Sequence, residues 1–63
     1  MIITFTDLEG TFFAFNLNHL EGISCHQHSI VIFPLNTPCS SYPVSREEAE
    51  KVEKQLEKFA KNT

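Results

Sequence analysis

The side chains best suited to chemistry gather in one short segment, Cys25-His26-Gln27-His28. Cysteine and histidine are common ligands of zinc, which binds them in tetrahedral sites with ligand pairs spaced by two to four residues. The Cys-His-x-His spacing departs from that pattern, and neighbouring side chains of a strand point to opposite faces. A metal site is therefore the minor interpretation, and its candidate ligands are Cys25, His26, His28 and Cys39.

Nucleophilic catalysis would need more than these residues. A cysteine nucleophile requires a base within reach and a further group that orients the base. The chain lacks the Gly-x-Ser-x-Gly elbow of many hydrolases, and its two glycines are too few for a loop that cradles phosphate. We therefore expect no enzyme activity and no cofactor.

Length and composition predict a single domain over residues 1–63. The chain has no run of about eighteen apolar residues, so we expect no membrane-spanning helix. The first residues lack the basic start of a secretory signal, which favours a cytoplasmic location. There Cys25 and Cys39 would be free thiols that pack as small apolar side chains. A disulfide between them is the alternative in an oxidising compartment.

Charge is distributed unevenly along the chain. The net charge is −3, yet all five lysines and arginines lie at or after position 46. Before that point the acidic residues are Asp7, Glu9 and Glu21. Affinity for nucleic acid comes largely from lysine and arginine contacts to phosphate, so we expect no nucleic-acid partner. We expect no membrane partner either, because acidic and basic residues balance near the C-terminus.

A β-sheet must position most of these residues. The expected strands share an alternating apolar pattern rich in β-branched and aromatic residues, and they cover residues 1–6, 11–16, 20–26 and 29–33. Residues 7–10 have the composition of a type I turn, and residues 16–19 predict a tight connection or one helical turn. Gly22 marks a bulge or a bend at the start of the third strand, and Pro34 ends the last strand.

One amphipathic helix is predicted over residues 45–62. A proline-containing loop precedes it at 35–44, either irregular throughout or with a short extended piece at Ser41-Tyr42. Ser45 and Glu48 have the spacing of a capping box, in which each side chain satisfies a backbone N–H of the other residue. Apolar residues then recur along one stripe of the helix. They are Ala49, Val52, Leu56, Phe59 and Ala60.

The predicted fold class is α+β. An antiparallel β-meander of about four short strands occupies residues 1–34, and the C-terminal helix packs on one sheet face. One helix covers one face, so alternation should leave the other face polar. The second and fourth strands are instead apolar on both sides. The side chains left on the uncovered face are Ile2, Phe12, Ala14, Val31 and Phe33.

A contiguous apolar patch of this kind usually marks an interface. We therefore predict that these five residues bind a partner, either a second copy of the chain, most simply in a dimer, or another protein. The alternative is that strong sheet twist and residues 35–43 of the loop together cover the patch. Its candidate covering residues are Leu35, Cys39 and Tyr42.

Several segments occur in a recognisable order. They are Leu8-Glu9-Gly10, Phe13, Phe15-Asn16, Leu20-Glu21-Gly22-Ile23, Ile30-Val31-Ile32 and Tyr42-Pro43-Val44-Ser45-Arg46-Glu47-Glu48. This order resembles the small flagellar proteins of the FlbD/SwrD type. The chain departs from them at Pro34, at Pro38 and at the serine pair that follows, and the Cys-His-Gln-His segment has no counterpart. The resemblance implies a non-enzymatic motility accessory and carries no catalytic residue.

The sequence thus favours a small non-catalytic protein–protein interaction module, or a regulatory accessory protein, that acts through the apolar sheet face. Two alternatives stay open. One is an acidic inhibitor, encoded by a phage or mobile element, that occupies the basic surface of a host nuclease or defence complex. The other is a metal- or small-ligand-binding protein that uses Cys25, His26 and His28.

Overall fold

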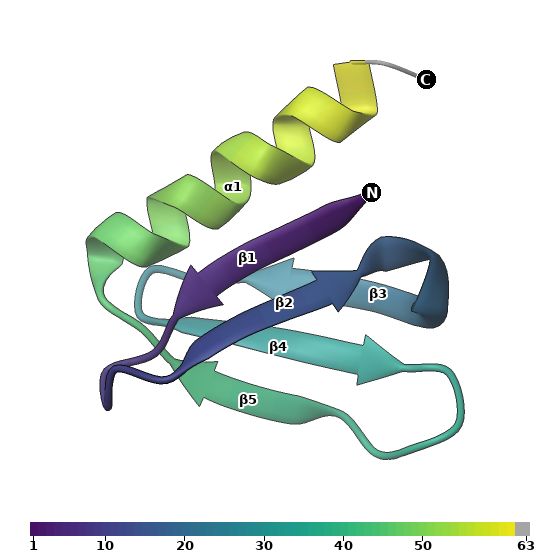
Figure 1. Cartoon of the computed structure of the whole chain (residues 1–63), viewed down its shortest axis with the longest axis horizontal. Helices are drawn as coiled ribbons and strands as arrows, with labels where there is room; N and C mark the ends of the chain where they lie inside the picture. The colour runs from purple at the N-terminus through teal and green to yellow at the C-terminus, as the bar shows by residue number, and fades with distance from the viewer. Residues whose placement is uncertain (62–63) are drawn as a thin grey trace.

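The structure, a computed structural model, describes residues 1–61, with side chains as far as Phe59. Its elements follow the order β1 (Ile2–Thr6), β2 (Phe12–Asn16), the 3-10 turn η1 (Leu17–His19), β3 (Leu20–Cys25), β4 (Ser29–Pro34), β5 (Ser40–Pro43) and α1 (Arg46–Lys61). All strand pairs are antiparallel, and α1 packs against β1 (Figure 1). The predicted α+β class is confirmed. The predicted helix extended to residue 62, which lies outside the described residues.

The strands form two sheets, where a single meander was expected. One sheet has the order β1-β2, and the other has the order β3-β4-β5. The chain changes sheets at η1, where the Asn16 side chain accepts a hydrogen bond from the Asn18 N–H at 3.0 Å. This turn redirects the backbone, so β3 pairs with β4 and not with β2. A register shift between Leu20 and Gly22 confirms the predicted bulge.

The predicted 35–44 loop contains a strand. Residues Ser40–Pro43 form β5 at the edge of the second sheet, with Tyr42 opposite Ile30 and Ser40 opposite Ile32. A proline lacks the N–H needed inside a sheet but is tolerated at the end of an edge strand. Pro43 occupies such an end, which is why a proline-rich sequence still pairs here.

The β1–β2 turn is held by the Asp7 side chain. Its Oδ1 accepts hydrogen bonds from the N–H groups of Glu9 at 3.0 Å and Thr11 at 2.9 Å. Gly10 has a φ of 87°, a left-handed conformation that glycine adopts without strain. This turn fixes the hairpin register, and with it the face to which each β2 side chain points.

The core lies between the two sheets and α1. Its fully buried side chains are Ile3, Phe5, Ile30, Ile32, Val44, Ala49 and Val52. Beside them, Tyr42 of β5 lies 4.7 Å from Phe13 and 5.9 Å from Phe15 of β2, measured between ring centroids. The predicted alternation is therefore confirmed in β2 and β4, because Phe13, Phe15, Ile30 and Ile32 all pack on the core.

Candidate functional site

The five residues predicted to bind a partner lie on two surfaces. Ile2, Phe12 and Ala14 lie on the outer face of the β1–β2 sheet. Val31 and Phe33 lie on the outer face of the β3–β4–β5 sheet. Because the two sheets enclose the core between them, their outer faces point away from each other. The single apolar patch expected from the sequence is thus divided between opposite sides of the molecule.

The alternative prediction, that the loop before the helix covers the apolar patch with Leu35, Cys39 and Tyr42, does not hold for either surface. The side chain of Leu35 is 51% exposed, and Cys39 is exposed as well. Tyr42 points inward to the aromatic side chains of β1 and β2. The segment contributes to the core through Tyr42 and leaves the apolar outer residues accessible.

Of the two outer faces, that of β1–β2 is the more exposed. Phe12 is 66% exposed, and its cross-strand neighbour is the smaller Thr6, so the ring projects from the sheet. On the other face, Phe33 is 38% exposed. Val31 there is half-buried and lies between Ser24 and Ser41 of the flanking strands. The β1–β2 face therefore offers the larger accessible aromatic surface.

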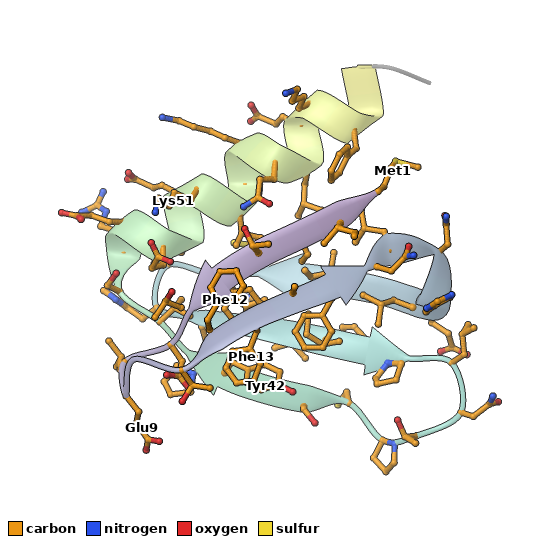
Figure 2. The ribbon with its side chains drawn as sticks, viewed as in Figure 1. Met1, Glu9, Phe12, Phe13, Tyr42 and Lys51 are labelled. Carbon is orange, nitrogen blue, oxygen red and sulfur yellow. The ribbon has the colours of Figure 1, made fainter. Side chains whose placement is uncertain are left out.

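A hollow of about 280 Å³ lies between this face and α1. Phe12 lines it from the sheet, and Lys51 and Lys54 line it from the helix. The side chains of Phe12 and Lys51 are labelled in Figure 2. The ammonium of Lys51 lies 3.0 Å from a carboxylate oxygen of Glu48. The exposed aromatic ring is thus bordered by a polar, mainly basic helix surface, and an apolar centre beside a polar rim is the usual anatomy of a protein interface.

Side chains of α1 occupy the free edge of β1. The Gln55 amide oxygen accepts the Thr4 N–H at 3.0 Å, and its nitrogen donates to the Thr4 carbonyl at 2.9 Å. The Thr6 N–H donates to Glu48 Oε1 at 2.9 Å. This bond, together with Lys51, holds the pKa of the Glu48 carboxyl below its ordinary value. The helix thus satisfies backbone groups that a neighbouring strand would otherwise pair.

The outer edge of β2 has no such neighbour among residues 1–61. Strand β2 pairs with β1 on one side only. The nearby strand β5 pairs with β4 and not with β2. An unpaired edge presents a row of N–H and C=O groups that can pair with another extended chain. The β2 edge is therefore a second candidate interaction surface, adjacent to the outer face that carries Phe12.

The Cys25–His28 segment does not assemble a metal site. No group of three His, Cys, Asp or Glu side chains within the described part of the chain could hold a metal ion. The Cys25 thiol donates to the Ala49 carbonyl at 3.2 Å, and His26 Nε2 lies 2.8 Å from Ser24 Oγ. Burial, with a smaller effect of the Glu53 charge, raises the pKa of the Cys25 thiol, which disfavours the thiolate that a metal would bind.

Both cysteines are free thiols. Cys25 is half-buried beside α1, in the position of a small core side chain that was expected from the sequence. Cys39 is exposed, contrary to that expectation. A hollow of about 380 Å³ beside Cys25 is lined by His26 and by charged residues of α1, and Cys39 does not line it.

No family model, curated protein or solved structure matches this chain. The resemblance to small flagellar proteins therefore stays a prediction. No helix within residues 1–61 combines the length and the apolar character needed to cross a membrane.

Sequence reasoning missed both the protected β1 edge and the open β2 edge. A signal for the first was present, because Gln55 lies on the apolar stripe of the helix, three residues after Val52 and four before Phe59. A polar residue on a core-facing stripe needs a hydrogen-bond partner. The open edge carries no local signal, since it depends on which strands pair.

Proposed function

We propose that this protein is a non-catalytic protein-interaction module that docks a partner on the outer face of its β1–β2 sheet. The observation that carries the proposal is Phe12, an aromatic residue that is 66% exposed at the turn end of a regular hairpin. Large exposed apolar side chains that form part of a patch usually mark a binding surface. Ile2, 57% exposed, and Ala14 extend the apolar surface along the same face.

The rigidity of this face supports the same function. The Asp7 turn and the β1–β2 ladder hold the backbone of Phe12 in place, so little backbone conformational entropy is lost when a partner binds. A cytoplasmic location belongs to the proposal, since the free thiols Cys25 and Cys39 suit a reducing compartment.

The two alternative functions have less support. An acidic inhibitor would present carboxylates to a basic target, but the Asp7 carboxylate already accepts two backbone hydrogen bonds of its own turn. Glu9 and Glu21 lie in separate elements, the first turn and β3. A metal-binding function would need ligands that converge, and the described residues contain no such group.

The test compares two phenylalanines on opposite faces. Tagged wild-type protein, Phe12→Asp and Phe33→Asp are used to capture partners from the native host, and bound proteins are quantified by mass spectrometry. We expect Phe12→Asp to lose a partner at least about ten-fold, since a buried unpaired charge at an interface costs more than 1.4 kcal/mol. Phe33→Asp should retain it.

Circular dichroism and thermal unfolding of each variant check that the fold persists, because an exposed side chain can be replaced without opening the core. Equal capture by wild type and Phe12→Asp would contradict the proposal. Loss of capture by Phe33→Asp alone would move the docking surface to the other sheet.

A further inference from the structure

The orientation of the β2 backbone follows from the hydrogen bonds of β1. The N–H groups of Thr4 and Thr6 point to α1, where they bond to Gln55 and Glu48. In an antiparallel ladder, opposite residues either exchange hydrogen bonds with each other or both direct these groups away. Ala14 is opposite Thr4.

Phe12 is in turn opposite Thr6 and Asn16 is opposite Ile2. The N–H and C=O groups of Phe12, Ala14 and Asn16 are therefore directed away from β1. This places three residues with outward-directed backbone groups along a strand of five residues.

This edge lacks the usual protective features. Natural sheets protect free edges with charged side chains, prolines, bulges or a covering element. Residues 11–18 contain no charged residue and no proline, and the β1–β2 register has no shift. The β1 edge shows the contrast, because α1 covers it. The β5 edge ends at Pro43.

We propose that a second copy of this chain pairs with the β2 edge, strand against strand and antiparallel, with the two-fold axis at Ala14. Only this register pairs the whole of β2 with itself, because Ala14 is the central residue of the strand. Phe12 then lies opposite Asn16 of the second copy, and Phe13 lies opposite Phe15 of the second copy. The two β1–β2 hairpins become one four-stranded sheet.

Charge and size at the axis fit a second copy. A residue on a two-fold axis meets its own counterpart, so a charged side chain there would face an identical charge at close range. Ala14 is uncharged and small, and its neighbours Phe13 and Phe15 are uncharged as well. Both rings are only half-buried in the monomer, so the second strand would remove further aromatic surface from water.

The expected dimer is weak and reversible. A five-residue strand pair buries far less than the roughly 1,200–2,000 Å² of a stable protein–protein interface. We therefore expect association at concentrations of roughly 10–100 µM rather than nanomolar ones. This edge adjoins the outer face that carries the proposed function, and Ala14 belongs to both: its backbone groups to the edge and its side chain to the face. Because the dimer is tested on the purified chain alone, its failure would leave the partner-capture result unaffected.

Disulfide trapping tests the register. Ala14→Cys, in a Cys39→Ser background, places two thiols on the axis, where the Cα atoms of a hydrogen-bonded antiparallel pair lie about 5.5 Å apart and within reach of a disulfide. Thr4→Cys in the same background is the matched control, since Thr4 lies opposite Ala14 but on the strand that α1 covers. We expect a covalent dimer linked through position 14 for the first variant and none for the second.

Sedimentation velocity tests the association itself. Wild type and Ala14→Thr should show a concentration-dependent dimer. Ala14→Lys should stay monomeric, with at least a ten-fold weaker association, because it opposes two ammonium groups at the axis. Denaturant unfolding of Ala14→Lys checks that its hairpin persists. A wild-type monomer up to 1 mM, an equally strong Ala14→Lys dimer, or equal trapping through position 4 would each overturn the proposal.

Discussion

Glu48 shows how tertiary structure changes the role of a local motif. Its spacing from Ser45 predicts a capping box, and half of that box forms, since Ser45 Oγ accepts the Glu48 N–H at 3.3 Å. The carboxylate does not return to the cap. It bonds to the Thr6 N–H and to Lys51 instead. An unpaired strand N–H near the interior needs a partner more than a cap N–H that water can reach.

The pKa of Glu48 predicts how stability depends on pH. The Thr6 N–H and Lys51 lower this pKa from an ordinary value of 4.5, so ionised Glu48 stabilises the fold at neutral pH. That contribution is lost as the pH falls below 4.5 and through the lowered pKa. We expect Glu48→Gln to lower the free energy of unfolding at pH 7 by roughly 0.5–1 kcal/mol.

Urea unfolding of wild type and Glu48→Gln at pH 7 and at pH 2.5 checks this expectation. The difference between the two proteins should be largest at pH 7 and should shrink at the acidic pH. Glu47→Gln is the control, because Glu47 is exposed and also lies in the first turn of α1. A constant difference across the pH range would contradict the electrostatic explanation.

Among the elements, α1 has two functions. One stripe closes the core with Ala49 and Val52, which are 3% and 0% exposed. The same side of the helix occupies the β1 edge through Gln55, whose amide both donates to and accepts from Thr4 as the backbone of a neighbouring strand would.

Replacement of Gln55 should show what this edge contact contributes. Gln55→Leu keeps an apolar surface for the core but leaves the N–H and C=O of Thr4 without their partner. We expect a loss of about 1–3 kcal/mol in the free energy of unfolding. The matched control is Lys54→Leu, one position away on the exposed side of the helix, which should change stability by less than about 0.5 kcal/mol. Similar losses in the two variants would show that the Thr4 contact contributes nothing.

The sequence predicted those elements well whose conformation depends on residues that are close together in the chain. The Asp7 turn, the alternation in β2, the Gly22 bulge and the single turn at Leu17–His19 all depend on neighbouring residues, and the structure confirms them. Strand β5 was predicted as part of a loop, with at most a short extended piece at Ser41-Tyr42, whereas the strand covers Ser40–Pro43. It forms because β4 offers an edge to which Ser40–Pro43 can pair, and such a contact between distant segments leaves no periodic pattern in the sequence.

In the molecule as a whole, the exposure of the candidate residues was predicted in part. Alternation correctly indicated that Ile2, Phe12 and Phe33 point out of the core. It could not indicate that they point in opposite directions, because the pattern of a strand distinguishes inside from outside but does not say which sheet the strand joins. Because the chain changes sheets at η1, the residues of the one predicted patch lie on two different sheets.

The position of α1 along the β1 edge also sets which motions the molecule can make separately. Within β1, the N–H groups of Thr4 and Thr6 depend on the helix, whereas those of Ile3 and Phe5 are directed to β2. Lifting of α1 would release the first pair and leave the hairpin ladder intact. For that interval the hairpin would expose both of its edges, so movement of a single helix would turn a hairpin with one open edge into a hairpin with two.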